Sequence, residues 1–200
     1  MKDIVMPCGN EKEFIGMAKK LGFDELVFLY VNKTQFYTEK EDIKITNFLI
    51  SDEKKVQKGV SAFVKAPKDP RLAFEKAKPL CVFGLELQKK DFMHHRGSGF
   101  NHIMAKAAYQ NNVCMGFSFS MVLNACEINR AKIIGRIKQN IILVRKNKVK
   151  TVIGSFTNNP MQMRAPKDLV AFFTVLGMHA KEARDSLNRT FKKKSKVELT

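Results

Sequence analysis

The segment between Ile128 and Lys150 has the clearest chemical signature in this 200-residue sequence. It contains no Asp or Glu, so its cations cannot form the i,i+4 ion pairs that stabilise an ordinary solvated helix. Lys and Arg side chains bind phosphate groups, and each contact releases a condensed counterion. The segment therefore predicts contact with nucleic acid. Its eight cations are Arg130, Lys132, Arg136, Lys138, Arg145, Lys146, Lys148 and Lys150.

The same segment carries an apolar stripe. Its members recur at helical spacing, which predicts a helix over about 129–148 with one buried face. The stripe consists of Ile134, Ile137, Ile141 and Val144. We expect the basic residues to occupy the remaining, exposed surface, with Lys138 and Arg145 two turns apart on one side.

A glycine-containing loop offers a second candidate site. Gly97 and Gly99 let the backbone approach a ligand closely, and Ser98 between them is expected to cap the helix that follows. Free N–H groups at a helix start beside Arg96 would suit a phosphate. The alternative is a simple turn that binds nothing.

A polar loop over residues 154–168 is the third candidate. It follows the last predicted strand and opens a helix, and it carries hydroxyl and amide side chains. Arg164 adds a forked cation suited to phosphate. The alternative is turn chemistry at Asn158-Asn159-Pro160, with Arg164 paired to Asp168.

Catalytic patterns are scarce. The sequence has no G-x-S-x-G elbow, no phosphate-binding Walker loop and no paired carboxylates. His94, His95 and His102 have Asp91 as their one acidic neighbour, and metal sites want several convergent ligands. We therefore predict no catalytic residue, no metal site and no cofactor in this chain.

Composition places the chain among ordinary globular proteins, with 44% hydrophobic and 28% charged residues. The net charge of +17 is uneven, because residues 101–200 contain 18 basic but 5 acidic residues. Such a field attracts polyanions. There is no apolar run of the ~18 residues that a membrane span needs, and the first residues do not form a secretory signal.

The four cysteines are isolated, with no C-x-x-C pair. Cys81, Cys114 and Cys126 stand among apolar residues, where a free cysteine behaves as a small hydrophobe. Together with the composition, this predicts a soluble protein of the reducing cytoplasm.

Seven short apolar runs predict strands. Several are nearly continuous, which is typical of strands in a parallel sheet covered on both faces. The runs are Asp3–Met6, Leu26–Val31, Lys44–Ile50, Ser61–Ala66, Leu80–Leu85, Val113–Phe119 and Thr151–Phe156.

Amphipathic stretches alternate with these runs, so the fold class is α/β. The expected helices are Glu11–Leu21, Asp52–Lys58, Pro70–Lys78, Phe100–Asn111, Asn129–Lys148, Pro166–Leu176 and Ala180–Thr190. Seven strands without a dinucleotide fingerprint favour a compact (β/α) TIM-type barrel over an open doubly wound sheet. We expect one domain over residues 1–188 and a basic tail over 189–200.

Several of these segments resemble ribonuclease P protein component 3. The similarity lies in the runs Arg96–Asn101, Asn112–Ser120, Arg145–Val149 and Arg164–Leu169, and in Leu176-Gly177-Met178. It covers about residues 93–188. The resemblance implies a barrel distantly like the polymerase-and-histidinol-phosphatase class.

The resemblance also implies a function. The chain would bind ribonuclease P RNA and assist removal of the 5′ leader from precursor tRNA, while the RNA, expected to use Mg²⁺, performs cleavage. Protein component 2 and other subunits would be its partners. The residues that we expect to bind RNA are Arg96, Ser98, Arg130, Lys132, Arg136, Lys138, Arg145, Lys146 and Arg164. A metal-dependent barrel phosphoesterase and an RNA-binding protein outside ribonuclease P remain alternatives.

Overall fold

Seven parallel strands form one sheet in the order of the sequence. The computed structural model describes residues 1–52, 61–87, 91 and 96–191. All seven predicted strands are present, with ends shifted by at most two residues. They are β1 (Lys2–Val5), β2 (Glu25–Tyr30), β3 (Lys44–Ser51), β4 (Ala62–Lys65), β5 (Cys81–Phe83), β6 (Cys114–Ser118) and β7 (Thr151–Gly154).

The first and last strands meet and close the sheet. Val5 bridges Thr157 in parallel orientation, just beyond β7. The Phe156 N–H donates to the Ile4 carbonyl at 2.7 Å, and the Met6 N–H donates to the Thr157 carbonyl at 2.8 Å. The predicted (β/α) barrel is therefore confirmed.

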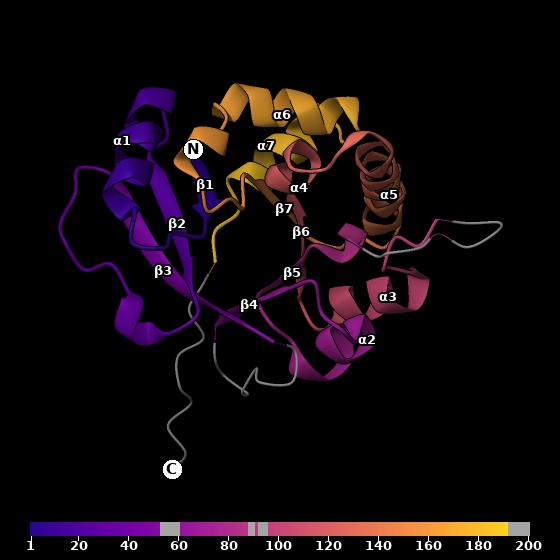
Figure 1. Cartoon of the computed structure of the whole chain (residues 1–200). Coiled ribbons are helices and arrows are strands. Elements are labelled where there is room, and N and C mark those ends of the chain that lie inside the picture. The colour runs from indigo at the N-terminus through magenta and orange to yellow at the C-terminus, as the bar shows by residue number, and fades with distance from the viewer. Residues whose placement is uncertain (53–60, 88–90, 92–95, 192–200) are drawn as a thin grey trace, which may run out of the picture.

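Helices pack around the outside of the barrel (Figure 1). They are α1 (Glu11–Leu21), α2 (Pro70–Leu72, followed by a π-helical turn over Ala73–Ala77), α3 (His102–Gln110), α4 (Phe119–Leu123), α5 (Glu127–Lys146), α6 (Pro166–Val175) and α7 (Ala180–Leu187). The sequence places Phe119 in a strand, but it begins the short helix α4. Apart from Asp52, the predicted helix Asp52–Lys58 lies outside the described residues.

The core has two layers because each strand buries both of its faces. In β2, Leu26 and Phe28 pack outward against the helices, while Val27 and Leu29 fill the barrel interior. This period-two alternation is the geometry of a strand. It explains why the strands read as continuous apolar runs rather than as alternating ones.

The amino ends of the strands are closed by the chain's last described residue. The Phe191 ring lies 5.7 Å from the Phe48 ring and 4.9 Å from the Phe63 ring, centroid to centroid. The Arg189 Nε donates to the Thr151 carbonyl at 3.0 Å. Residues 189–191 of the predicted tail thus pack against the barrel, and 192–200 lie outside the described residues.

The burial of the cysteines agrees with the sequence-based expectation in two of three cases. Cys81 and Cys114 are buried as expected, but Cys126 is exposed. It immediately precedes α5, where the chain leaves the core. In the described ranges, no helix has the length and apolarity to cross a membrane.

Candidate nucleic-acid interface

Helix α5 buries more than its predicted stripe. Ile137, Ile141 and Val144 are fully buried as expected, but Ile133 takes the place of Ile134, which is only partly buried. The buried face also contains two polar side chains, Arg136 and Asn140. The helix therefore carries a polar network on its inner side as well as cations on its outer side.

The sequence predicts Arg136 on the exposed surface, and this prediction is wrong. The residue is 2% exposed. Its Nε and Nη2 lie 2.9 and 2.8 Å from Asp91 Oδ1, and its Nη1 donates to the Glu86 carbonyl at 2.9 Å. The guanidinium holds the pKa of Asp91 below its usual range. Arg136 thus ties α5 to the loop after β5, and its partners lie too far away in sequence for helical spacing to reveal them.

Glu86 is the buried centre of this network. The Asn140 Nδ2 donates to Glu86 Oε1 at 2.8 Å and to the Ser98 carbonyl at 3.1 Å. Burial raises the pKa of Glu86 to about 7, although the Asn140 hydrogen bond and the Arg136 charge oppose the rise. Glu86 Oε2 has no hydrogen-bond partner in the described part of the chain.

The glycine loop does not form the predicted helix cap. Ser98 is 2% exposed, and its hydroxyl donates to the Phe100 carbonyl at 3.1 Å. Asn101 caps α3 instead, since its Oδ1 accepts from the Met104 N–H at 3.0 Å. Ser98 therefore has a structural place inside the protein.

Arg96 is exposed and lies across α5. A Cβ added at Gly135 would stand 2.8 Å from Arg96 Nε, so only glycine allows this approach. The side chain passes over the outer side of the helix, next to the surface that carries the other exposed cations.

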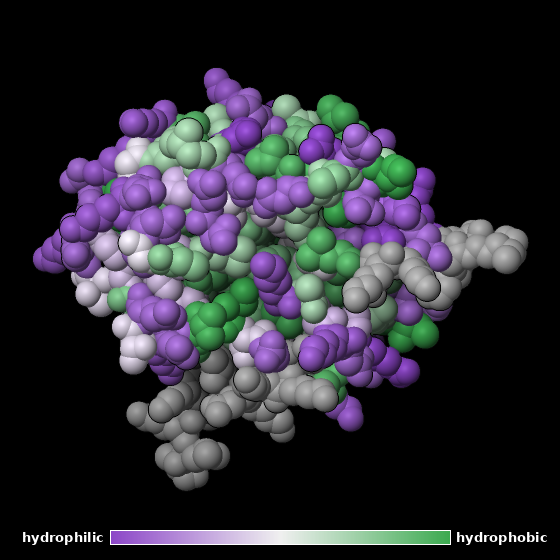
Figure 2. All heavy atoms as spheres, in the orientation of Figure 1, coloured by the Kyte–Doolittle hydropathy of each residue, from purple (hydrophilic) through white to green (hydrophobic). Residues whose placement is uncertain are grey.

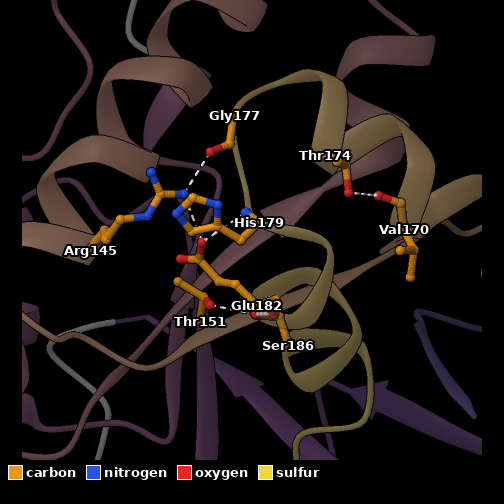
Figure 3. Close-up of polar contacts among 8 residues, drawn as sticks. All are labelled: Arg145, Thr151, Val170, Thr174, Gly177, His179, Glu182 and Ser186. Atoms are coloured by element: carbon orange, nitrogen blue, oxygen red, sulfur yellow. Dashed lines mark hydrogen bonds and ion pairs between the residues drawn. The ribbon is translucent and has the colours of Figure 1, made fainter.

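Arg145 joins α5 to α7 (Figure 3). Its Nη2 donates to the Gly177 carbonyl at 2.6 Å and lies 2.7 Å from Glu182 Oε2. The same carboxylate accepts from the His179 N–H at 3.2 Å at the start of α7. The acidic partner that is absent from the α5 segment is thus supplied by another helix.

Arg130 and Arg164 also contact the protein backbone. Arg130 donates to the carbonyls of Val122, Leu123 and Ala125 at 3.0–3.3 Å and so caps the end of α4. Arg164 donates to the carbonyls of Met161 and Met163, and its guanidinium carbon lies 5.7 Å from the Phe119 ring centroid. The alternative pairing of Arg164 with Asp168 does not occur.

Three of the predicted residues are exposed lysines of α5: Lys132, Lys138 and Lys146. None forms an ion pair with any described residue. The nine predicted residues therefore fall into three groups. Three are exposed lysines without an ion pair among the described residues, four are exposed or partly exposed arginines that contact the protein surface, and Ser98 and Arg136 are buried.

A cavity of about 610 Å³ opens at the carboxyl ends of the strands, where a barrel normally carries its function. Lys65 and Lys132 line it, together with the hydroxyl and amide side chains of Ser120, Asn124 and Asn129. Among the described residues that line it, Glu86 is the one carboxylate. Hydrophilic side chains cover much of the face seen in Figure 2, with apolar side chains scattered among them.

Sequence reasoning missed a second buried carboxylate, Asp3 in β1. Its Oδ1 accepts from the backbone N–H groups of Ile4 and Ser155, at 2.8 and 2.7 Å. Burial raises the pKa of Asp3 to about 6. The sequence offers one sign of this buried carboxylate, which is an acidic residue inside an otherwise apolar strand. Among the described residues, no three His, Cys, Asp or Glu side chains gather as a metal site, and His94 and His95 lie outside them.

The class of protein that the fold defines is a (β/α) barrel, and its helix α5 carries three exposed lysines that form no ion pair with any described residue. A family model, RNase P subunit p30, matches residues 89–193, which is more than half of the chain. The chain belongs to this family, and the resemblance noted in the sequence is confirmed.

Individual relatives agree with the family match. Ribonuclease P protein component 3 of Methanosarcina mazei is 32% identical over 113 residues, covering 54% of this chain and 47% of the relative. The protein of that name from Thermococcus gammatolerans is 35% identical over 118 residues, covering 59% and 52%. These alignments span about half the length of the relatives.

A solved structure matches the whole barrel. A chain in the cryo-EM structure of archaeal ribonuclease P with mature tRNA superposes with a TM-score of 0.73 at 22% sequence identity. The match covers 100% of this chain and 97% of the other. It establishes the fold over the amino-terminal half as well, where sequence similarity is weaker.

Proposed function

We propose that this chain is an RNA-binding protein subunit of ribonuclease P that assists removal of the 5′ leader from precursor tRNA. The observation that carries the proposal is the family match over residues 89–193, because this region contains all of α5 and its unpaired lysines. The RNA would perform the cleavage, with Mg²⁺ bound to the RNA rather than to this chain.

A binding role rather than a catalytic one also suits the barrel mouth. Hydrolytic barrels need a metal or a pair of titratable groups at this end. Of the cavity's lining residues that the structure describes, only Glu86 is acidic, and its Oε1 already accepts a hydrogen bond from Asn140. The cavity therefore supports recognition of an anionic surface better than acid–base chemistry.

Lys132, Lys138 and Lys146 are the first residues that we assign to RNA, because their ammonium groups are free and exposed. Arg96, Arg130, Arg145 and Arg164 would add contacts with the donors that their protein partners leave unused. Ser98 and Arg136 act indirectly in this proposal, since both are buried and fix the loop beside α5.

Protein partners would bind to exposed apolar side chains on the outer helices. Ile128 and Ile142 on α5 are 71% and 63% exposed, and Val175 at the end of α6 is 78% exposed. A partner that covered these side chains would remove their apolar area from water, which favours association. We propose that they contact protein component 2 or another subunit, and that assembly occurs in the cytoplasm.

Reconstitution tests the proposal. Ribonuclease P RNA and the other protein subunits are mixed with and without this chain, and cleavage of precursor tRNA is measured. We expect the chain to raise the rate at limiting Mg²⁺, and the chain alone to cleave nothing. An unchanged rate would reject the subunit role, and metal-dependent cleavage by the chain alone would favour the phosphoesterase alternative.

A further inference from the structure

A second basic surface lies at the amino ends of the strands, on the side of the barrel opposite the mouth. Two adjoining pockets of about 470 and 410 Å³ share Lys148 and Lys150, which stand just before β7. One wall is α7, and the other is the end of α3. We name this continuous depression, centred on Lys148 and Lys150, the basal groove.

Cations outnumber acids in the basal groove. It contains Arg145, Lys148, Lys150, Lys181 and Arg189, against the two carboxylates Glu182 and Asp185. Arg145 neutralises Glu182. The Lys150 Nζ donates to Asn112 Oδ1 at 2.6 Å, which fixes its position without neutralising its charge. Lys148 and Lys181 form no ion pair with any residue that the structure describes.

The backbone of Lys148 has a conformation that glycine adopts more readily. The residue has φ 56°, in the left-handed region, directly after the cap of α5. The Val149 N–H reaches back to the Val144 carbonyl at 2.9 Å, as in a Schellman motif, in which glycine normally fills this position. Glycine would adopt the conformation at lower cost. Folding alone therefore favours glycine here, whereas the observed lysine supplies an unpaired cation to the groove.

An aromatic side chain completes the basal groove. Tyr109 near the end of α3 is 57% exposed and lines the same pocket as Asn112 and Lys150. Exposed aromatic rings beside lysines are the arrangement with which proteins bind single-stranded nucleic acid, because the lysines hold phosphates while a base stacks on the ring.

We propose that the basal groove binds a single-stranded segment of RNA, with phosphates at Lys148 and Lys150 and a base stacked on Tyr109. The inference rests on the proposed function for the class of ligand. It adds a site that is separate from the outer face of α5 and lies on the end of the barrel away from the mouth.

The test uses the full chain and two fluorescein-labelled probes, a 12-nucleotide single-stranded RNA of mixed sequence and a blunt-ended RNA duplex of the same length. The double variant Lys148→Gly/Lys150→Gln removes two charges. We expect its affinity for the single strand to fall about tenfold, and the salt slope of log K to become shallower by about 1.4, or roughly 0.7 per lost phosphate contact. Thermal unfolding should not shift downward, since glycine suits the left-handed position.

Two further variants separate charge from stacking. Tyr109→Ala should weaken binding of the single strand at least fivefold and leave binding of the duplex unchanged, because paired bases cannot stack on the ring. Tyr109→Phe should restore binding. Lys20→Gln/Lys33→Gln removes two exposed charges elsewhere and is the matched control, which should change affinity less than twofold.

The outcomes distinguish this inference from the proposed function. Wild-type affinity in the double variant and in Tyr109→Ala would overturn the basal groove while leaving the subunit role intact. Equal weakening of both probes by Tyr109→Ala would reject a stacked single strand. Failure of the wild-type chain to bind either RNA would overturn both proposals.

Discussion

At the scale of single residues, burial separates the cations that the sequence presents as equivalent. Arg136 and Lys138 are two positions apart in one helix, yet Arg136 is buried against Asp91 and Lys138 is exposed. Helical spacing identifies a buried face only to within about one residue, and it says nothing of partners that lie 45 residues away. The split between structural and free cations therefore required tertiary contacts.

The Arg136→Gln variant should be strongly destabilised. It removes the cationic partner of Asp91 from a mostly buried ion pair. The Asp91 Oδ1 then keeps only the hydrogen bond from the Gly97 N–H among the described residues, and the Glu86 carbonyl is left without the Arg136 donor. We expect a loss of about 3 kcal/mol, the low end for such pairs because the Asp91 side chain is 28% exposed. Urea unfolding measures it. Lys138→Gln is the control and should lie within about 0.5 kcal/mol of wild type.

Glu86 should make stability depend on pH. Its pKa of about 7 lies above the value of about 4.3 expected in the unfolded chain, so the folded state holds the proton more tightly. Stability from this group is full below about pH 4 and is lost as the pH rises through 7. The free energy of unfolding should therefore fall less between pH 6 and pH 8 in Glu86→Gln than it does in wild type.

Unfolding by urea at pH 5, 6 and 8 provides this comparison. Asp3, whose pKa is about 6, also lowers the free energy of unfolding as the pH rises, mainly below pH 6. This contribution is the same in wild type and in Glu86→Gln. Parallel profiles for wild type and Glu86→Gln between pH 6 and 8 would show that Glu86 is already ionised in the folded protein.

At the scale of elements, the sequence predicts α5 well and its surface only in part. The stripe of isoleucine and valine fixes the helix because burial of one face dominates its stability. Its basic face contains free lysines, but also Arg145, which binds Gly177 and Glu182. Helix α4 was missed, since five residues are too few to show a period against a preceding strand.

The free lysines of α5 should account for much of its RNA affinity. Changing Lys132, Lys138 and Lys146 together to Gln keeps side-chain length and helix propensity. We expect the salt slope of log K for ribonuclease P RNA to become shallower by about 2–2.7, at roughly 0.7–0.9 per phosphate contact, with no change in unfolding temperature. Filter binding from 50 to 300 mM salt measures it, and an unaltered slope would place the RNA on another surface.

Arg145 should matter more for the docking of α7 than for that salt slope, because its guanidinium already binds Glu182. Arg145→Gln loses the contact to Glu182, which is partly exposed, so the cost should be about 1 kcal/mol or less. Hydrogen exchange should rise in α7 and in the turn around Gly177. Unchanged exchange there, with a shallower salt slope, would return Arg145 to the group of free cations.

At the scale of the whole molecule, the barrel was predictable because seven apolar runs alternate with helices. Its closure was not, since it depends on residues beyond β7 and on the Val5–Thr157 bridge. Nor could the sequence show that Phe191 packs against Phe48 and Phe63 at the barrel's end. Such contacts join distant segments and leave no local pattern.

The isolated protein should fold without a divalent metal and should not cleave precursor tRNA. The expected result is an identical unfolding temperature with and without a chelator, and intact precursor in the presence of Mg²⁺. The reason is the lack of a gathered ligand set among the residues that the structure describes. Cleavage that a chelator and His95→Ala both abolish would contradict this prediction.

The most direct test of the central claim is to sequence the RNA that co-purifies with the protein from its own cells. A chromosomal tag keeps the protein at its natural level, and a strain with the tag alone is the control. We expect strong enrichment of ribonuclease P RNA, with precursor tRNA beside it. Enrichment of another RNA without ribonuclease P RNA, or of no RNA, would contradict it.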